Sequence, residues 1–118
     1  VTGSYDNSAK IWDVQTGTCK VTLQGRDQHL SETLSASFSP TGLVVLTASS
    51  DHHARIWQVK SRRCILELCG HQGDVNAACF SPDGVLILTG SNDRSAKLWF
   101  TETGKCKRTL SGHTGNVK

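Results

Sequence analysis

Methionine is absent from this sequence, proline occurs only twice, and aromatic residues make up 6% of its 118 positions. Long apolar runs are also lacking, since none approaches the roughly 20 residues that a membrane-spanning helix requires. We therefore expect no membrane partner. No secretory signal peptide is visible, but the chain opens at Val1, inside one copy of a repeated motif. We expect it to be a piece of a longer protein.

The patterns that mark chemical sites are missing too. The histidines, cysteines and acidic residues show no metal-ligand spacing, and there is no CxxC pair. The glycines stand singly at turns, which differs from the glycine-rich loop of a phosphate site. We therefore predict a protein without a metal, a cofactor or catalytic residues, that is, a protein that is not an enzyme.

The net charge of +3 is small and spread along the chain. Its densest clusters are Arg62–Arg63 and Lys105–Arg108, and nucleic-acid binding needs a larger clustered basic surface than these provide. We interpret both clusters as parts of a solvated outer face and expect no nucleic-acid partner.

Five cysteines, an odd number, favour free thiols and therefore a reducing compartment. Three of them, Cys19, Cys64 and Cys106, occupy one place in the repeated motif, which predicts a packing position that recurs in each copy. We expect a cytoplasmic protein, with the nucleus or a cilium as alternatives.

What the sequence does contain is one motif in three copies. It reads TGSYDNSAKIW over 2–12, TASSDHHARIW over 47–57 and TGSNDRSAKLW over 89–99. The aspartates are Asp6, Asp51 and Asp93, so the spacings are 45 and 42 residues. A repeat of this length built around a tryptophan is a propeller-blade signature.

Between these copies, short segments of alternating polarity predict β-strands separated by turns, and no segment has a helical period. Residues 43–49, LVVLTAS, are apolar at successive positions, which predicts a strand that is buried on both faces. Pro40 and Pro82 are each followed two residues later by a glycine, a pattern that predicts tight turns at 40–42 and 82–84. The expected strands are 1–4, 8–14, 19–25, 33–39, 43–49, 53–59, 63–69, 74–81, 85–91, 95–101 and 105–112.

The chain resembles the WD-repeat family of β-propellers. The resemblance rests on Gly70-His71 and Gly112-His113, on FSPTG at 38–42 and FSPDG at 80–84, and on Trp12-Asp13. It implies an all-β fold, namely part of a propeller whose blades are four-stranded antiparallel meanders. By that alignment, residues 1–25 form a blade lacking its first strand. Complete blades follow at 26–70 and 71–112, and 113–118 open another.

The resemblance also implies a hydrogen-bonded set of His, Thr, Asp and Trp that staples each blade. The third copy supplies all four members, whereas the second has Arg26 at the histidine position, three extra residues in that loop and His29 three residues further on, so its histidine member stays open. The implied members are His71, Thr89, Asp93 and Trp99, then Thr47, Asp51 and Trp57, then Thr2, Asp6 and Trp12, and finally His113. A Thr–His–Asp set could also suggest a nucleophilic triad. We favour the structural role because the set recurs in each repeat and ends in an indole.

Propellers usually hold partners on their faces. Family alignment implies one face for proteins or peptides, made of the loops before each first strand and the turns before each third strand. The candidate residues are Tyr5, Glu32, Leu34, Ser50, Asp74, Asn76, Asn92 and Asn116, beside the inserted residues 27–30. We predict a protein-interaction scaffold. An architectural subunit of a cytoskeletal or ciliary assembly and the recognition domain of a longer enzyme stay open as alternatives.

Each blade buries a face of its sheet against the next. The remaining blades of a larger propeller in the same chain are therefore expected partners too. We expect this segment expressed alone to be unstable, to aggregate, or to close into a ring with copies of itself.

Overall fold

The computed structural model describes residues 1–25 and 31–118, and within them every regular element is a β-strand. The strands are β1 (Thr2–Gly3), β2 (Ser8–Trp12), β3 (Cys19–Gln24), β4 (Thr33–Phe38), β5 (Val44–Ser49), β6 (Ala54–Gln58), β7 (Arg63–Leu68), β8 (Val75–Phe80), β9 (Leu86–Ser91), β10 (Ser95–Phe100) and β11 (Cys106–Ser111). Their ends differ by about one or two residues from the predicted segments. The all-β prediction is confirmed.

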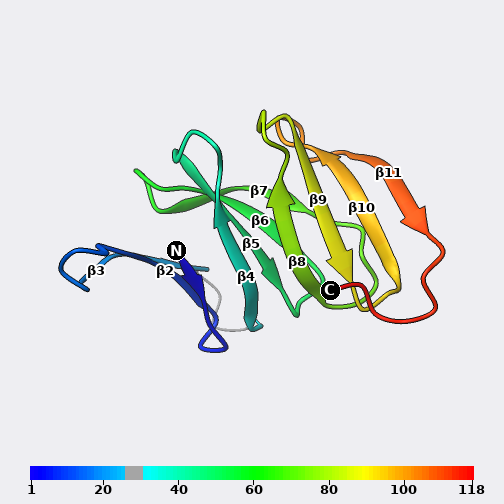
Figure 1. The fold of residues 1–118 in the computed structure, drawn as a ribbon, viewed down its shortest axis with the longest axis horizontal. Helices are drawn as coiled ribbons and strands as arrows, with labels where there is room; N and C mark the ends of the chain where they lie inside the picture. The colour runs from blue at the N-terminus through cyan, green and yellow to red at the C-terminus, as the bar shows by residue number, and fades with distance from the viewer. Residues whose placement is uncertain (26–30) are drawn as a thin grey trace.

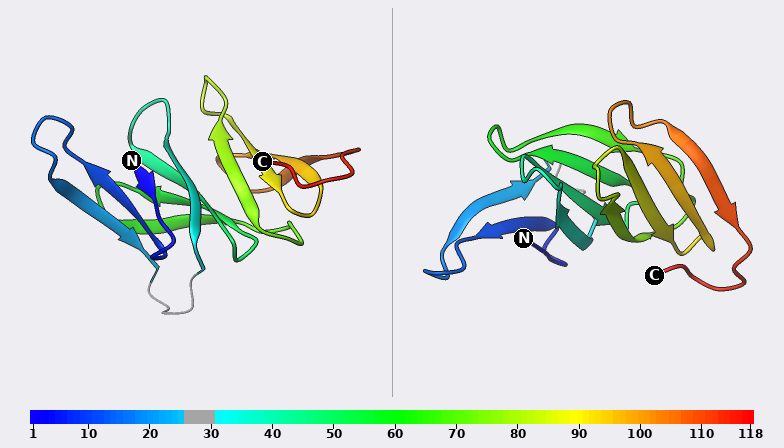
Figure 2. Two further views of the ribbon diagram at one scale, coloured as in Figure 1. Left: turned by 60° about the horizontal axis from the view of Figure 1, so that its bottom comes forward. Right: turned by 45° about the horizontal axis from the view of Figure 1, so that its top comes forward.

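The strands form three antiparallel sheets, each a simple meander: β1-β2-β3, β4-β5-β6-β7 and β8-β9-β10-β11. The sheets stand side by side in chain order, so that the second lies between the first and the third (Figure 1). Two further views show the same succession (Figure 2). This is the arrangement that part of a propeller requires, so the predicted architecture is confirmed as well.

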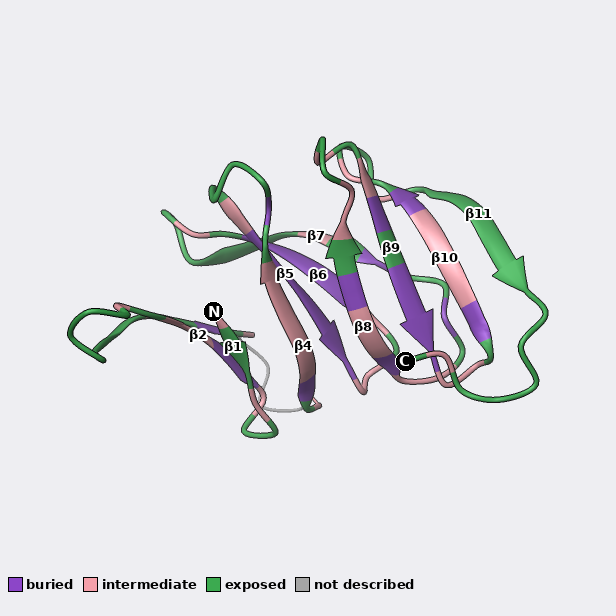
Figure 3. Ribbon diagram, in the orientation of Figure 1, coloured by how far each residue is buried: buried purple, intermediate pink, exposed green. Residues whose placement is uncertain are grey.

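The second sheet is covered on both sides, as residues 43–49 predict. Leu46 faces the third sheet in a cluster with Ile87 and Trp99, while Val45 faces the first sheet in a cluster with Leu23. Successive side chains of a strand point to opposite faces, which is why neighbouring residues serve different clusters. Purple ribbon therefore dominates β5 and β6 (Figure 3). Leu43 is the exception, because it lies in the preceding turn and is 70% exposed.

The cysteine prediction is wrong. Cys19, Cys64 and Cys106 are all exposed, on the outermost strands β3, β7 and β11. In each sheet the register shifts beside the tryptophan, so that the cysteine pairs with it across a bulge. The Sγ atom of each cysteine lies 3.5–3.6 Å from the carbonyl oxygen of the residue two positions later in its own strand. The recurrence of cysteine there accompanies the bulge and does not reflect packing between sheets.

The turn between the third and fourth strand positions requires a left-handed residue. Gly17 and Gly104 have φ values of 70° and 69°, while Arg62, at the same place in the second sheet, has φ 59°. A side chain in that region costs about 1–2 kcal/mol, and glycine avoids this cost.

We therefore expect Arg62→Gly to raise the free energy of unfolding by up to about 1 kcal/mol, once the entropy that glycine loses on folding is subtracted. Denaturant titration of the purified protein measures this effect. Arg63→Gly is the matched control, because Arg63 is also exposed but lies in β7, where glycine weakens a strand. Equal effects of the two substitutions would contradict the explanation.

Candidate functional site

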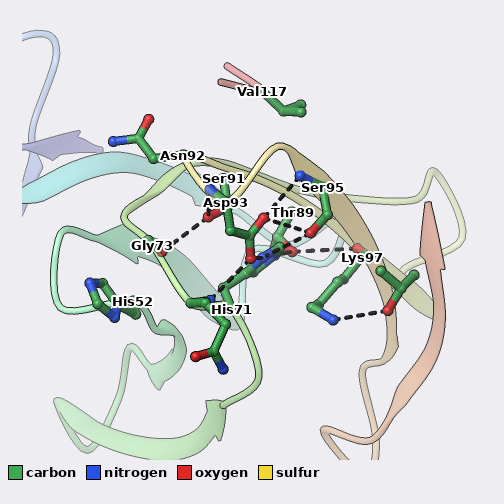
Figure 4. Close-up of polar contacts among 12 residues, drawn as sticks. His52, His71, Gly73, Thr89, Ser91, Asn92, Asp93, Ser95, Lys97 and Val117 are labelled. Carbon is green, nitrogen blue, oxygen red and sulfur yellow. Dashed lines mark hydrogen bonds and ion pairs between the residues drawn. The ribbon is translucent and has the colours of Figure 1, made fainter. Parts of the chain in front are cut away.

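A buried polar network joins four elements of the third sheet, and Figure 4 shows His71, Thr89 and Asp93 of it. His71 precedes β8, Thr89 lies on β9, Asp93 is in the β9–β10 turn and Trp99 is on β10. The Nδ1 atom of His71 is 2.7 Å from Oδ2 of Asp93, and its Nε2 atom is 2.7 Å from Oγ1 of Thr89. The indole N–H of Trp99 donates to the same Oγ1 at 2.9 Å. The four side chains therefore form one continuous chain of hydrogen bonds.

The protons of this network can be assigned by satisfying every group. Asp93 is an acceptor, so Nδ1 of His71 carries a hydrogen and donates to it. With a neutral ring, Nε2 accepts the hydroxyl proton of Thr89; with a hydrogen on Nε2, the Thr89 hydroxyl donates instead to the carbonyl of Lys97 at 3.4 Å. In both cases the Thr89 oxygen accepts the indole N–H of Trp99. The Thr89 side chain is thus fully engaged, and the residue is 1% exposed. A substrate has no access to this hydroxyl, which disfavours the reading of Thr–His–Asp as a nucleophilic triad.

Asp93 is held in its charged form. Burial alone would raise its pKa, but hydrogen bonds from Ser95, from His71 and from the backbone N–H of Gln72 outweigh burial and hold the pKa well below its usual range. Oγ of Ser95 lies 2.6 Å from Oδ1 of Asp93, and the backbone nitrogen of Gln72 lies 3.0 Å from Oδ2. The carboxylate thus ties the loop before β8 to the turn before β10.

The second sheet repeats only part of this network. Trp57 donates its indole N–H to Oγ1 of Thr47 at 2.8 Å. Asp51, however, meets the guanidinium of Arg55, with Nη2 at 2.7 Å from its Oδ2. Arg26, which the resemblance placed at the histidine position, lies outside the described residues. A small hollow borders Thr47, Trp57 and Arg55 on the side of the first sheet.

The first sheet has the tryptophan pair in an open setting. Trp12 donates to Oγ1 of Thr2 at 2.8 Å, although Trp12 is 40% exposed. Asp6 accepts from the amide and the hydroxyl of Ser8. His113 is exposed near the chain end. Within residues 1–25 and 31–118, the structure therefore brings all four implied members together in the third copy and joins the Thr–Trp pair in each of the other two.

Most of the residues implied for a partner-binding face lie in the loops before the first strands and in the turns before the third strands, but Leu34 lies on β4 and Asn76 on β8. Tyr5 is 74% exposed. Glu32 and Asn116 are exposed, while Leu34, Ser50, Asp74, Asn76 and Asn92 are half-buried. The inserted residues 27–30 fall outside the described part of the chain.

Two backbone bridges place these residues in neighbouring pairs. The amide of Ser50 donates to the carbonyl of Glu32 at 3.1 Å, and the amide of Asn92 donates to that of Asp74 at 2.9 Å. Side chains extend the second pair, because Asn92 donates to Asp74 and Asn76 donates to Asn92. The candidate residues of the second and third copies are thus grouped by the same local geometry.

Sequence reasoning missed two backbone bonds that reach beyond a sheet. The amide of Thr33 on β4 donates to the carbonyl of Ser4 at 3.0 Å and joins the second sheet to the first, while the amide of Val117, beyond β11, donates to the carbonyl of Ser91 on β9 at 2.9 Å. Asn76 adds a bond to the carbonyl of Val117. Because the acceptors are backbone carbonyls, which every residue carries, the side-chain sequence offered no direct signal for these bonds. The pairing of Arg55 with Glu67 was also missed, although the two face each other in the register of β6 and β7.

Residues 1–25 and 31–118 contain no cluster of three or more His, Cys, Asp or Glu side chains placed to bind a metal ion. They also contain no helix that could cross a membrane.

Comparison with known proteins gives a consistent result. The family described as "WD domain, G-beta repeat" (WD40) matches residues 17–58 and 62–99, which is more than half of the chain. Among similar proteins, Protein tipD of Dictyostelium discoideum is 40% identical over 74 residues, which are 63% of this chain and 12% of that protein. Pre-mRNA-processing factor 19 of Oryza sativa subsp. japonica is 35% identical over 77 residues, which are 65% of this chain and 14% of that protein. THO complex subunit 6 of Arabidopsis thaliana is 36% identical over 64 residues, which are 54% of this chain and 17% of that protein. The chain thus spans less than a fifth of the length of these relatives.

Proposed function

The chain belongs to the WD40 repeat family, and we propose that it is a non-catalytic part of a β-propeller that holds other proteins on one face. WD40 repeats imply a role as a scaffold for protein interaction. The specific proposal is that the loops and turns carrying Tyr5, Ser50 and Asn92 form the contact surface.

One observation carries this proposal. Position 5 of the first copy corresponds to 50 in the second and 92 in the third, and it is occupied by Tyr, Ser and Asn. The residues on either side are constant, since serine precedes and aspartate follows in all three copies. A constant framework thus presents a different side chain from each sheet at the same place. Such variation on a rigid support suits recognition of a partner protein or peptide.

The same reasoning supports a division into blades. We propose that residues 1–25, 26–70, 71–112 and 113–118 are a partial blade, two complete blades and the start of another. The outward face of the third sheet supports this, because Leu88 and Leu110 are 40% and 43% exposed. Leu46 and Leu68, their equivalents in the second sheet, are covered by the third sheet. The remaining blades of the same protein would cover the exposed pair.

We propose a cytoplasmic location, with the nucleus as the alternative. All five cysteines are free, which suits a reducing compartment. The printed names of two relatives refer to pre-mRNA processing and to the THO complex, and this supports keeping the nucleus open.

Affinity purification of the tagged full-length protein tests the proposed face. We expect the double variant Tyr5→Ala/Ser50→Arg to lose at least one co-purifying protein by about tenfold or more, a loss typical of removing an interface anchor. Val14→Arg is the matched control, because Val14 is 95% exposed but lies in the β2–β3 turn at the outer rim. An unchanged melting temperature shows that both variants are folded. Undiminished co-purification with the double variant, or an equal loss with the control, would count against this face.

A further inference from the structure

We propose that Arg55 holds the β5–β6 turn of the second sheet in the role that His71 has in the third. The same oxygen is engaged in both sheets, since Oδ2 of Asp93 is 2.7 Å from Nδ1 of His71 and Oδ2 of Asp51 is 2.7 Å from Nη2 of Arg55. The donors come from different places. His71 reaches its aspartate from the loop before the sheet, whereas Arg55 reaches Asp51 from β6 of the same sheet.

Arg55 is fixed by a second partner. Its Nε atom donates to Oε1 of Glu67 at 2.8 Å, and Glu67 lies directly opposite on β7. The guanidinium can serve both acids at once because it carries several donors in a planar fork. The arginine is 9% exposed. Burial would lower its pKa, but Asp51 and Glu67 together raise it above its ordinary value, so the side chain stays charged between them.

The other two sheets provide an internal comparison. Lysine stands at the position of Arg55 and threonine at that of Glu67, giving Lys10–Thr22 at 3.3 Å and Lys97–Thr109 at 2.9 Å. These lysines donate to neutral hydroxyls on the outer strand. The two changes, from lysine to arginine and from threonine to glutamate, therefore occur together in the one copy that has Arg26 at its histidine position.

Arg55 is accordingly a positioning residue for one end of the candidate face. The turn that it ties down begins at Ser50 and includes His52, which lies 3.8 Å from Asp74 of the third sheet. This last step rests on the proposed function. The tie itself does not, because stability and amide exchange report on it whether or not a partner is bound.

The first test removes the tie from the full-length protein. We expect Arg55→Lys/Glu67→Thr, which copies the pair found in the other sheets, to lower the melting temperature by about 5 °C or more, because Asp51 is left without its guanidinium. Hydrogen exchange should become faster at the amide of His53, which donates to Asp51. Arg55→Lys alone is a milder second variant if the double variant does not fold.

The second test transplants the tie. His71→Ala should destabilise the third sheet, and adding Lys97→Arg and Thr109→Glu should recover at least half of the lost melting temperature. If Arg55 only filled space in the second sheet, the transplanted arginine and glutamate would not restore the melting temperature of the third. The matched control is Lys97→Arg/Thr109→Glu with His71 intact, in which Asp93 is already engaged, so that little change is expected.

Two results would overturn the proposal. One is a melting temperature and a His53 exchange rate that do not change when Arg55 and Glu67 are replaced. The other is a triple variant that melts at the same temperature as His71→Ala alone. A higher melting temperature of the triple variant than of His71→Ala, together with a lower one when Arg55 and Glu67 are replaced, would establish that Arg55 takes the role of the histidine in the second sheet.

Discussion

Replacing Leu46 by alanine is expected to destabilise the protein by about 2–5 kcal/mol, the range for emptying a well-packed leucine site. Leu46 is completely buried, in the cluster that joins the second sheet to the third. The opposing residues, which include Ile87 and Trp99, belong to another sheet. They cannot collapse into the space without moving strands.

The matched control is Leu43→Ala. Leu43 lies three residues earlier in the same apolar run but is 70% exposed, so we expect a change within about 0.5 kcal/mol. Denaturant titration of the purified protein, followed by far-UV circular dichroism, measures both substitutions. Similar losses at the two positions would show that the contact between the sheets is not what stabilises this part of the chain.

Asp93→Ala is expected to cost about 3 kcal/mol or more, because it removes the acceptor of several buried donors. His71 is 5% exposed, and its ring N–H would be left without a partner. The hydroxyl of Ser95 and the amide of Gln72 would lose their acceptor as well. No catalytic readout is expected to respond. A loss comparable to that of the exposed turn variant Asp83→Ala would contradict a stapling role.

The same carboxylate predicts a dependence on pH. The pKa of Asp93 is held below its usual range in the folded protein, whereas in the unfolded chain it is about 3.9. The unfolded state therefore binds the proton first as pH falls. The stability that Asp93 contributes is fully present above about pH 4 and is lost progressively below it.

Asp93→Asn isolates this contribution from those of the other carboxylates. We expect the difference in melting temperature between the unmodified protein and the variant to be constant from pH 7 to pH 5 and to shrink below pH 4. A difference that is unchanged down to pH 3 would show that the charge of Asp93 does not stabilise the fold.

The repeat alone predicted most of the fold, because its information is local. Alternating polarity and turn residues predicted the strands and the turns between them, and the family resemblance implied which threonine would lie beside which tryptophan. The pairing holds in every copy because the two residues sit on adjacent antiparallel strands joined by a tight turn. The Thr–Trp hydrogen bond consequently appears in all three sheets, at 2.8–2.9 Å.

The partners of the three aspartates could not be read from the motif in the same way. Asp93 meets a histidine, Asp51 an arginine and Asp6 the serine two residues after it. The aspartate is the same in all three copies, so its partner depends on residues that vary, such as Arg55 inside the second copy and His71 before the third. An acid on the next strand, such as Glu67, can redirect a long side chain, and only the register of β6 with β7 brings that acid opposite Arg55.

The sequence by itself determined that this protein is a repeat of short β-strands, since alternating polarity and turn residues act within one copy, whereas the polar pair at each tryptophan was implied by the family resemblance. The tertiary structure decided which side chains are covered and which carboxylates are paired. Cys64 and Leu43 look apolar and buried in the sequence yet are exposed. The physical reason is that burial and ion pairing depend on the neighbouring strand or sheet, which lies beyond the reach of any single motif.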